Sequence, residues 1–151
     1  MPYRAAHIAR YMIDRCAEGG HPVDNLKLQG MLYHVQERSL CASGTPMFDE
    51  DFEAWHFGPV LPEVYYRYCG FGALKIELCP GLGRPSELET INDDLVEIID
   101  PIMGKDCCLT PWKMADDLLR KGGAWDLTFN EGKGDHYVIP KDLISASCHI
   151  A

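Results

Sequence analysis

Cysteine and histidine are the side chains here best suited to nucleophilic catalysis or metal binding, and the sequence has seven and six of them. The closest Cys–His pairs in sequence are Cys16 with His21 and Cys148 with His149. A nucleophile and its base usually come from different elements, so closeness in sequence is weak support for catalysis. No CxxC pair offers the ligand spacing of a zinc site, and GxSxG, HExxH and SxxK motifs are absent. The sequence therefore predicts no enzyme, no metal and no cofactor.

Carboxylates are densest between Asp49 and Glu53, where hard cations such as Ca²⁺ would find oxygen ligands. The run lacks the alternating ligands and the glycine of an EF-hand loop, so we interpret it as a solvated acidic turn. The glycine pairs Gly70/Gly72 and Gly81/Gly83 lack the remaining residues of a phosphate-binding loop. No nucleotide site is predicted.

Aromatic residues gather directly after the acidic turn, at Trp55, Phe57, Tyr65, Tyr66 and Tyr68. Core packing explains Trp55 and Tyr65, and we expect Trp55 between the second helix and the helix that follows Pro59. Neighbouring positions of one helix point in different directions, so at least one of the tyrosines should be exposed. Exposed tyrosines are effective interface anchors. We therefore predict a protein-binding surface that includes Tyr66, Asp49 and Asp51.

Helical periodicity positions these residues in the first half of the chain. A first amphipathic helix begins near Ala5 and ends at Gly19, and a second begins after Asp24 or Asn25 and ends at Gly44. Gly30 lies inside the second helix, which indicates either close packing or a tolerated loss of helix stability. Residues 52–55 are predicted to be extended.

The remaining elements complete a mainly α (α+β) fold, a compact bundle of about five to six helices with one or two short β segments. We expect a helix beginning at Pro59 or Pro62, a strand over 73–79, a helix over 95–102 that Pro101 kinks or shortens, and a helix over 111–119. The C-terminal part predicts a turn centred on Trp125, a strand at 136–139 and a short helix opened by Pro140. No linker divides the chain, so 1–151 is expected to be one domain.

The net charge and the cysteine pattern indicate which partners and which cellular compartment suit this protein. The formal net charge is -9, which disfavours phosphate backbones and anionic membranes. The sequence has no run of 18 apolar residues and no signal-peptide segment at its start. An odd number of scattered cysteines suits a reduced cytoplasmic protein whose cysteines are mostly buried thiols.

Residues 27–65 contain three linked motifs: KLQxxLYxxQxxSL, then GxPxF, then FEAWxxGPVxPxVY. They resemble the Panacea domain, the family of SocA-like antitoxins and phage-associated GepA-type proteins, formerly a domain of unknown function. This chain has Gly30, His34 and Arg38 where the family commonly has a second lysine, a paired tyrosine and a tryptophan. The motif positions, expected to be mainly structural, are Lys27, Leu28, Gln29, Leu32, Tyr33, Gln36, Glu53, Trp55, Gly58, Pro59 and Tyr65.

The resemblance implies a non-enzymatic bacterial or phage protein that neutralises a toxin by binding it directly. In some members of the family the antitoxin acts as an adaptor to a protease. The expected partner is a cognate protein toxin, encoded by an adjacent gene. The alternatives are a phage-associated interaction protein without a toxin partner, an unrecognised enzyme and a DNA-binding protein.

Overall fold

The structure is a computed structural model that describes residues 3–77 and 93–148. Within these ranges it is mainly helical with a small antiparallel sheet, as the sequence predicted, although helices and strands are more numerous than expected. The elements are α1 (Ala5–Glu18), α2 (Asn25–Ser43), β1 (Glu53–Trp55), β2 (Gly58–Val60), α3 (Pro62–Tyr68), α4 (Asp93–Asp106), α5 (Pro111–Leu118), α6 (Ala124–Phe129), β3 (Tyr137–Val138) and α7 (Lys141–Ala146), with short 3-10 turns at Cys69–Phe71 and Asn130–Gly132.

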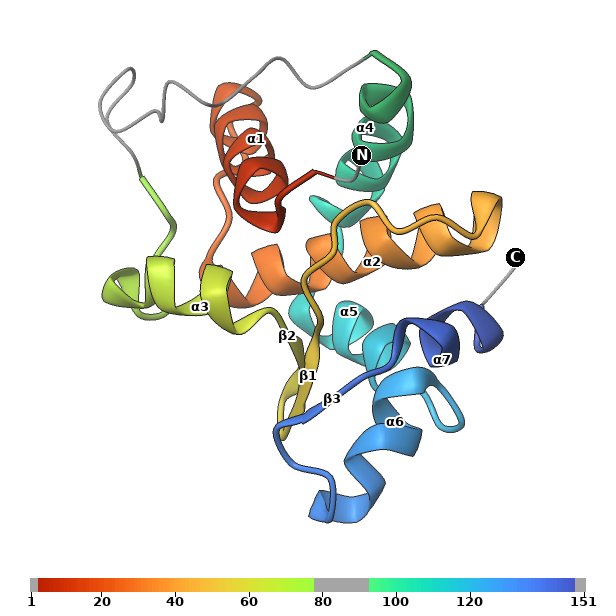
Figure 1. The fold of residues 1–151 in the computed structure, drawn as a ribbon. Helices are drawn as coiled ribbons and strands as arrows, with labels where there is room; N and C mark the ends of the chain where they lie inside the picture. Colours follow the sequence, from red (N-terminus) through yellow and green to blue (C-terminus); the bar gives the residue numbers. More distant parts are fainter. Residues whose placement is uncertain (1–2, 78–92, 149–151) are drawn as a thin grey trace.

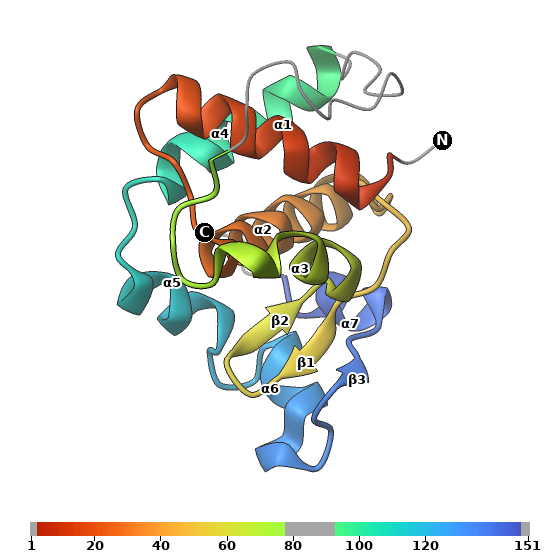
Figure 2. The same ribbon diagram turned by 90° about the vertical axis from the view of Figure 1, so that its left-hand side faces the viewer.

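Helix α2 lies at the centre of the molecule. Figures 1 and 2 show α1 and α4 on one side of it, and the sheet with α5, α6 and α7 on the other. It contacts α1, α4, α5 and α7, and it also contacts α3 and β2. This position explains why one face of α2 carries so many fully buried side chains, including Leu28, Met31, Leu32 and Val35.

The ends of α2 follow from local chemistry. The side chain of Asp24 accepts a hydrogen bond from the Lys27 amide at 2.8 Å, a typical N-cap. Gly44 adopts the left-handed conformation with φ 74° and ends the helix, because residues with a Cβ disfavour that region. Both ends were therefore predicted correctly from the sequence.

The sheet has the strand order β2–β1–β3, and all its pairs are antiparallel. A tight turn joins β1 to β2, with Trp55 opposite Gly58. Gly58 has a φ of 141°, which a residue with a side chain rarely adopts. Pro59 lies inside β2, and the following helix begins at Pro62 rather than at Pro59.

Helix α1 is tied to α4 by Asp100. The Tyr11 hydroxyl donates to this carboxylate at 2.8 Å, and the Arg15 guanidinium pairs with it at 3.2 Å. Burial, together with the bond to Asp100, raises the pKa of Tyr11 to about 12. Helix α4 continues through Pro101 to Asp106, so the proline does not shorten it as the sequence suggested.

The predicted strand over 73–79 is wrong for residues 73–77, and the rest of that range lies outside the described residues. Ile76 is buried and its amide donates to Val23 at 2.7 Å, whereas Leu74 is exposed. The segment runs beside the loop before α2 and not beside another strand, so it makes no ladder of hydrogen bonds. The bond from Ile76 to Val23 anchors it instead.

The predicted turn around Trp125 is also wrong, because Trp125 lies in α6. Gly123 is the N-cap residue, and the Asp126 carboxylate accepts a hydrogen bond from the Gly122 amide at 3.0 Å. The Trp125 indole donates to the carbonyl of Trp55 at 2.8 Å, which holds the helix against β1. This short helix depends on tertiary contacts that a local reading of the sequence does not contain.

The cysteines differ most from expectation. Cys41 and Cys148 form a disulfide, so the prediction of mostly buried thiols is wrong. Of the free cysteines in the described residues, Cys16 is buried and Cys107 is half-buried, while Cys69 and Cys108 are exposed.

Candidate partner-binding surface

Two glutamine side chains of α2 fasten the segments that lead to the candidate surface. Gln36 accepts from the Met47 amide at 2.8 Å and donates to the Phe48 carbonyl at 2.9 Å. Gln29 accepts from the Leu61 amide at 2.9 Å. Both side chains are buried, so each satisfies main-chain groups that water cannot reach. These motif positions therefore hold the loop before β1 and the start of α3 on α2.

Lys27 and Gly30 connect α2 to the region around α5. The Lys27 ammonium donates to the carbonyls of Cys107 and Leu109, at 2.8 and 3.3 Å. A Cβ placed on Gly30 would clash with the Met114 sulfur of α5, so close helix packing is the reason for this glycine. A small cleft of about 150 Å³ opens here, lined by Lys27, Gly30, Met114 and Phe57 among others.

His34 forms a clamp across three helices. Its Nδ1 lies 2.7 Å from an Asp106 oxygen of α4, and its Nε2 lies 2.6 Å from an Asp117 oxygen of α5. Burial alone would lower the pKa of His34, but the hydrogen bonds and charges of the two aspartates outweigh it and raise the pKa to about 9. His34 is therefore protonated at neutral pH and donates from both ring nitrogens.

The aromatic residues form one patch, which consists of Trp55, Phe57, Tyr65, Tyr66 and His136. The Trp55 ring contacts all four others, stacking on His136 with ring centroids 4.5 Å apart and meeting Tyr65 edge-on at 5.1 Å. The Trp55 indole also donates to Glu53 at 3.0 Å. Trp55 is buried as predicted and contacts α3, but it belongs to this patch and not to the main core cluster.

The candidate partner-binding residues lie on two segments, Tyr66 on α3 and the two aspartates on the loop before β1. Tyr66 is 61% exposed, while its ring contacts Trp55 at 6.0 Å and Tyr65 at 5.7 Å. Asp49 and Asp51 are exposed in the loop before β1, where Lys141 of α7 donates to the Asp49 carbonyl and to the Asp51 carboxylate. No hydrogen bond or ion pair of the described residues joins Tyr66 directly to either aspartate.

No group of three or more His, Cys, Asp or Glu side chains in residues 3–77 and 93–148 could hold a metal ion. Across the same ranges, no helix has the length and apolarity needed to cross a membrane.

The clamp of His34, Asp106 and Asp117 was missed by the sequence analysis. Its members are separated by 72 and 83 residues, and no motif links them. His34 was noted only as a departure from the family pattern.

Together these contacts define a class: a mainly helical domain whose central helix holds a small sheet and an exposed aromatic patch. The family model described as "Antitoxin SocA-like, Panacea domain" matches residues 28–126. The protein named Antitoxin SocA from Caulobacter vibrioides (strain NA1000 / CB15N) is 30% identical over 141 residues, covering 83% of this chain and 70% of that protein. The chain therefore belongs to the SocA-like antitoxin family with a Panacea domain. No solved structure matches the chain significantly.

Proposed function

We propose that this chain is a non-enzymatic antitoxin that neutralises a protein toxin by binding it through Tyr66 and the acidic loop at Asp49 and Asp51. The observation that carries the proposal is the geometry of Tyr66, which is exposed yet supported by Trp55 and Tyr65. A ring held in place before binding loses little conformational entropy when a partner covers it. Tyrosines of this kind are frequent among the residues that dominate interface energies.

The acidic loop is the second part of the proposed interface. Asp51 precedes Trp55 by four residues, which limits their separation to about 13 Å even for a fully extended chain. A standard interface covers about 800 Å² on each partner, which is wide enough to include both. With a net charge of -9, the chain would also attract a basic toxin over long range.

A binding assay against the product of the adjacent gene tests this surface. Tyr66→Ala should weaken binding by about 2 kcal/mol or more, roughly thirty-fold, because it removes a supported aromatic anchor. Trp112→Ala is the control, since Trp112 is 78% exposed but lies on α5, away from the patch and from the acidic loop. Each variant needs an unchanged unfolding midpoint before its affinity is interpreted.

The charge contribution is tested by association rates at low and high salt. Asp49→Asn with Asp51→Asn should slow association at low salt and reduce its salt dependence, while Asp116→Asn on the exposed face of α5 serves as the control. Tyr66→Ala without effect on affinity, together with unchanged association rates, would eliminate this surface. Failure of co-expression to rescue growth from the adjacent gene product would contradict the antitoxin function itself.

A further inference from the structure

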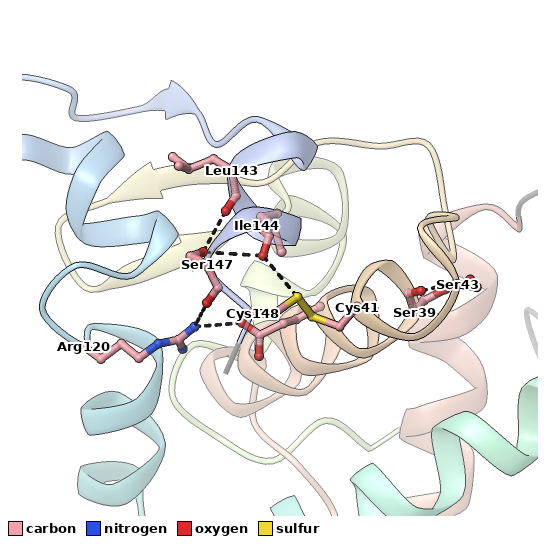
Figure 3. The surroundings of a disulfide bond; sticks show 9 residues. Ser39, Cys41, Ser43, Arg120, Leu143, Ile144, Ser147 and Cys148 are labelled. Carbon is pink, nitrogen blue, oxygen red and sulfur yellow. Dashed lines mark hydrogen bonds and ion pairs between the residues drawn. A yellow bond between two sulfur atoms is a disulfide. The ribbon is translucent and has the colours of Figure 1, made fainter. Parts of the chain in front are cut away.

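The C-terminal helix α7 is fastened to α2 by a covalent bond between distant parts of the chain. Cys41 lies on α2 and Cys148 follows α7, with a sequence separation of 107 and Cα atoms 6.0 Å apart (Figure 3). The same region is held by Arg120, whose guanidinium donates to the Ser147 carbonyl at 2.7 Å and pairs with Glu37 at 3.1 Å. Ile144 is the buried side chain of α7. Beside the disulfide, the buried Ile144 side chain and the Arg120 bridge therefore help to hold α7 on α2.

Cys41 is accessible from a groove between α2, α4 and α5. The groove has a volume of about 620 Å³, and its lining includes Cys41, Arg38, Lys105 and Lys113. A space of this size admits the reactive end of a thiol reductant. The thiolate is the attacking form of such a reagent. The groove carries charges of both signs, since Glu37, Glu97, Asp106 and Asp117 line it together with the cationic side chains.

We propose that Cys41–Cys148 is a reversible redox modification site that controls how firmly α7 is held on α2. The reductant is a dithiol of the thioredoxin class. Its thiolate attacks the Cys41 sulfur, the bond between Cys41 and Cys148 breaks, and Cys148 leaves as a thiolate that takes up a proton. The second thiol of the reductant then releases Cys41 and becomes part of the reductant's own disulfide. Two electrons and two protons pass to the chain, and a small disulfide such as oxidised glutathione reverses the reaction.

Reduction has consequences for the segments attached to α7. Lys141, in the first turn of α7, holds the loop at Asp49 and Asp51. At the same end of the helix, only residues 139 and 140 separate α7 from β3 of the sheet. A crosslink of this span limits the unfolded chain, so its loss lowers stability, and α7 is then held by noncovalent contacts such as those of Ile144, Leu143, Lys141 and Arg120. Local opening of α7 therefore becomes more frequent in the reduced form. This inference does not depend on the antitoxin function.

The test compares the oxidised chain, prepared with oxidised glutathione, and the chain reduced by dithiothreitol. Peptide mapping should find Cys41 and Cys148 linked in the first and both alkylated in the second. Reduction should lower the melting temperature by about 15 °C, the size expected for a crosslink of this span in a chain of this length. Amide exchange in α7 should become at least ten-fold faster.

Cys148→Ser is the matching variant and Cys69→Ser the control, because Cys69 is an exposed free thiol. Cys148→Ser should behave like the reduced chain under both conditions, and Cys69→Ser like the wild type. Titration in mixtures of reduced and oxidised glutathione should convert the two forms reversibly while the chain stays folded. The proposal is overturned if Cys41 and Cys148 never become linked, if the bond is reduced only after unfolding, or if melting and α7 exchange are the same in both forms.

Discussion

Raising the pH toward 10 should weaken the fold through one side chain, His34. The pKa of histidine in an unfolded chain is about 6.5, and the pKa of His34 in the folded chain is about 9. Since the folded pKa is the higher one, the stabilisation is complete below about pH 6.5 and is lost as the pH rises through 9. The two pKa values differ by about 2.5, and a difference of one in pKa corresponds to about 1.4 kcal/mol of stability. The expected loss is therefore about 3 kcal/mol.

Urea unfolding between pH 6 and pH 10 measures this loss. Thiols also titrate in this range, so the quantity of interest is the free energy of unfolding relative to a variant that lacks the clamp. The variant is His34→Gln with Asp106→Asn, because Asp106 is only 2% exposed and a lone His34 substitution would leave its charge buried without a partner. The difference between wild type and this variant should fall by about 3 kcal/mol across the range.

His21→Gln is the control for histidine titration in general, since His21 is exposed at the turn before α2. Its stability should follow the wild type at every pH. A constant difference between wild type and the double variant from pH 6 to pH 10 would refute the reasoning, because it would mean that His34 carries no charge that Asp106 and Asp117 stabilise.

Two further predictions concern packing and hydrogen bonding around α2. Gly30→Ala should be less favourable in the wild type than in the Met114→Ala background by about 1 kcal/mol or more, because the new Cβ meets the Met114 sulfur in the wild type and only the Leu118 side chain in the variant. Equal effects in both backgrounds would show that α2 and α5 are not in close contact. Gln36→Ala should lower the free energy of unfolding by about 2–4 kcal/mol in chemical denaturation, because the Met47 amide and the Phe48 carbonyl lose their buried partner. Arg38→Ala, on the exposed face of the same helix, is the control and should change stability by about 0.5 kcal/mol or less.

The family motif gains a physical meaning from the structure. Lys27, Gln29 and Gln36 could be recognised as a pattern in the sequence, but their partners are main-chain groups at Leu109, Leu61 and Met47. The spacing of the glutamines on α2 explains the linked motifs: each holds a segment that itself belongs to the pattern. The exposure of Tyr66 was predicted from helix geometry alone, since one helix cannot bury three nearby tyrosines.

The sequence by itself determined the features that depend on neighbouring residues: the start of α2 at Asp24 or Asn25, its end at Gly44, the apolar faces of the helices, and family membership. Tertiary structure alone decided which distant residues meet. The His34 clamp and the Cys41–Cys148 bond join positions more than seventy residues apart, and α6 forms where Trp125 can bond to β1. The physical reason is that caps and periodicity act within one or two helical turns, whereas hydrogen bonds between elements depend on how the whole chain packs.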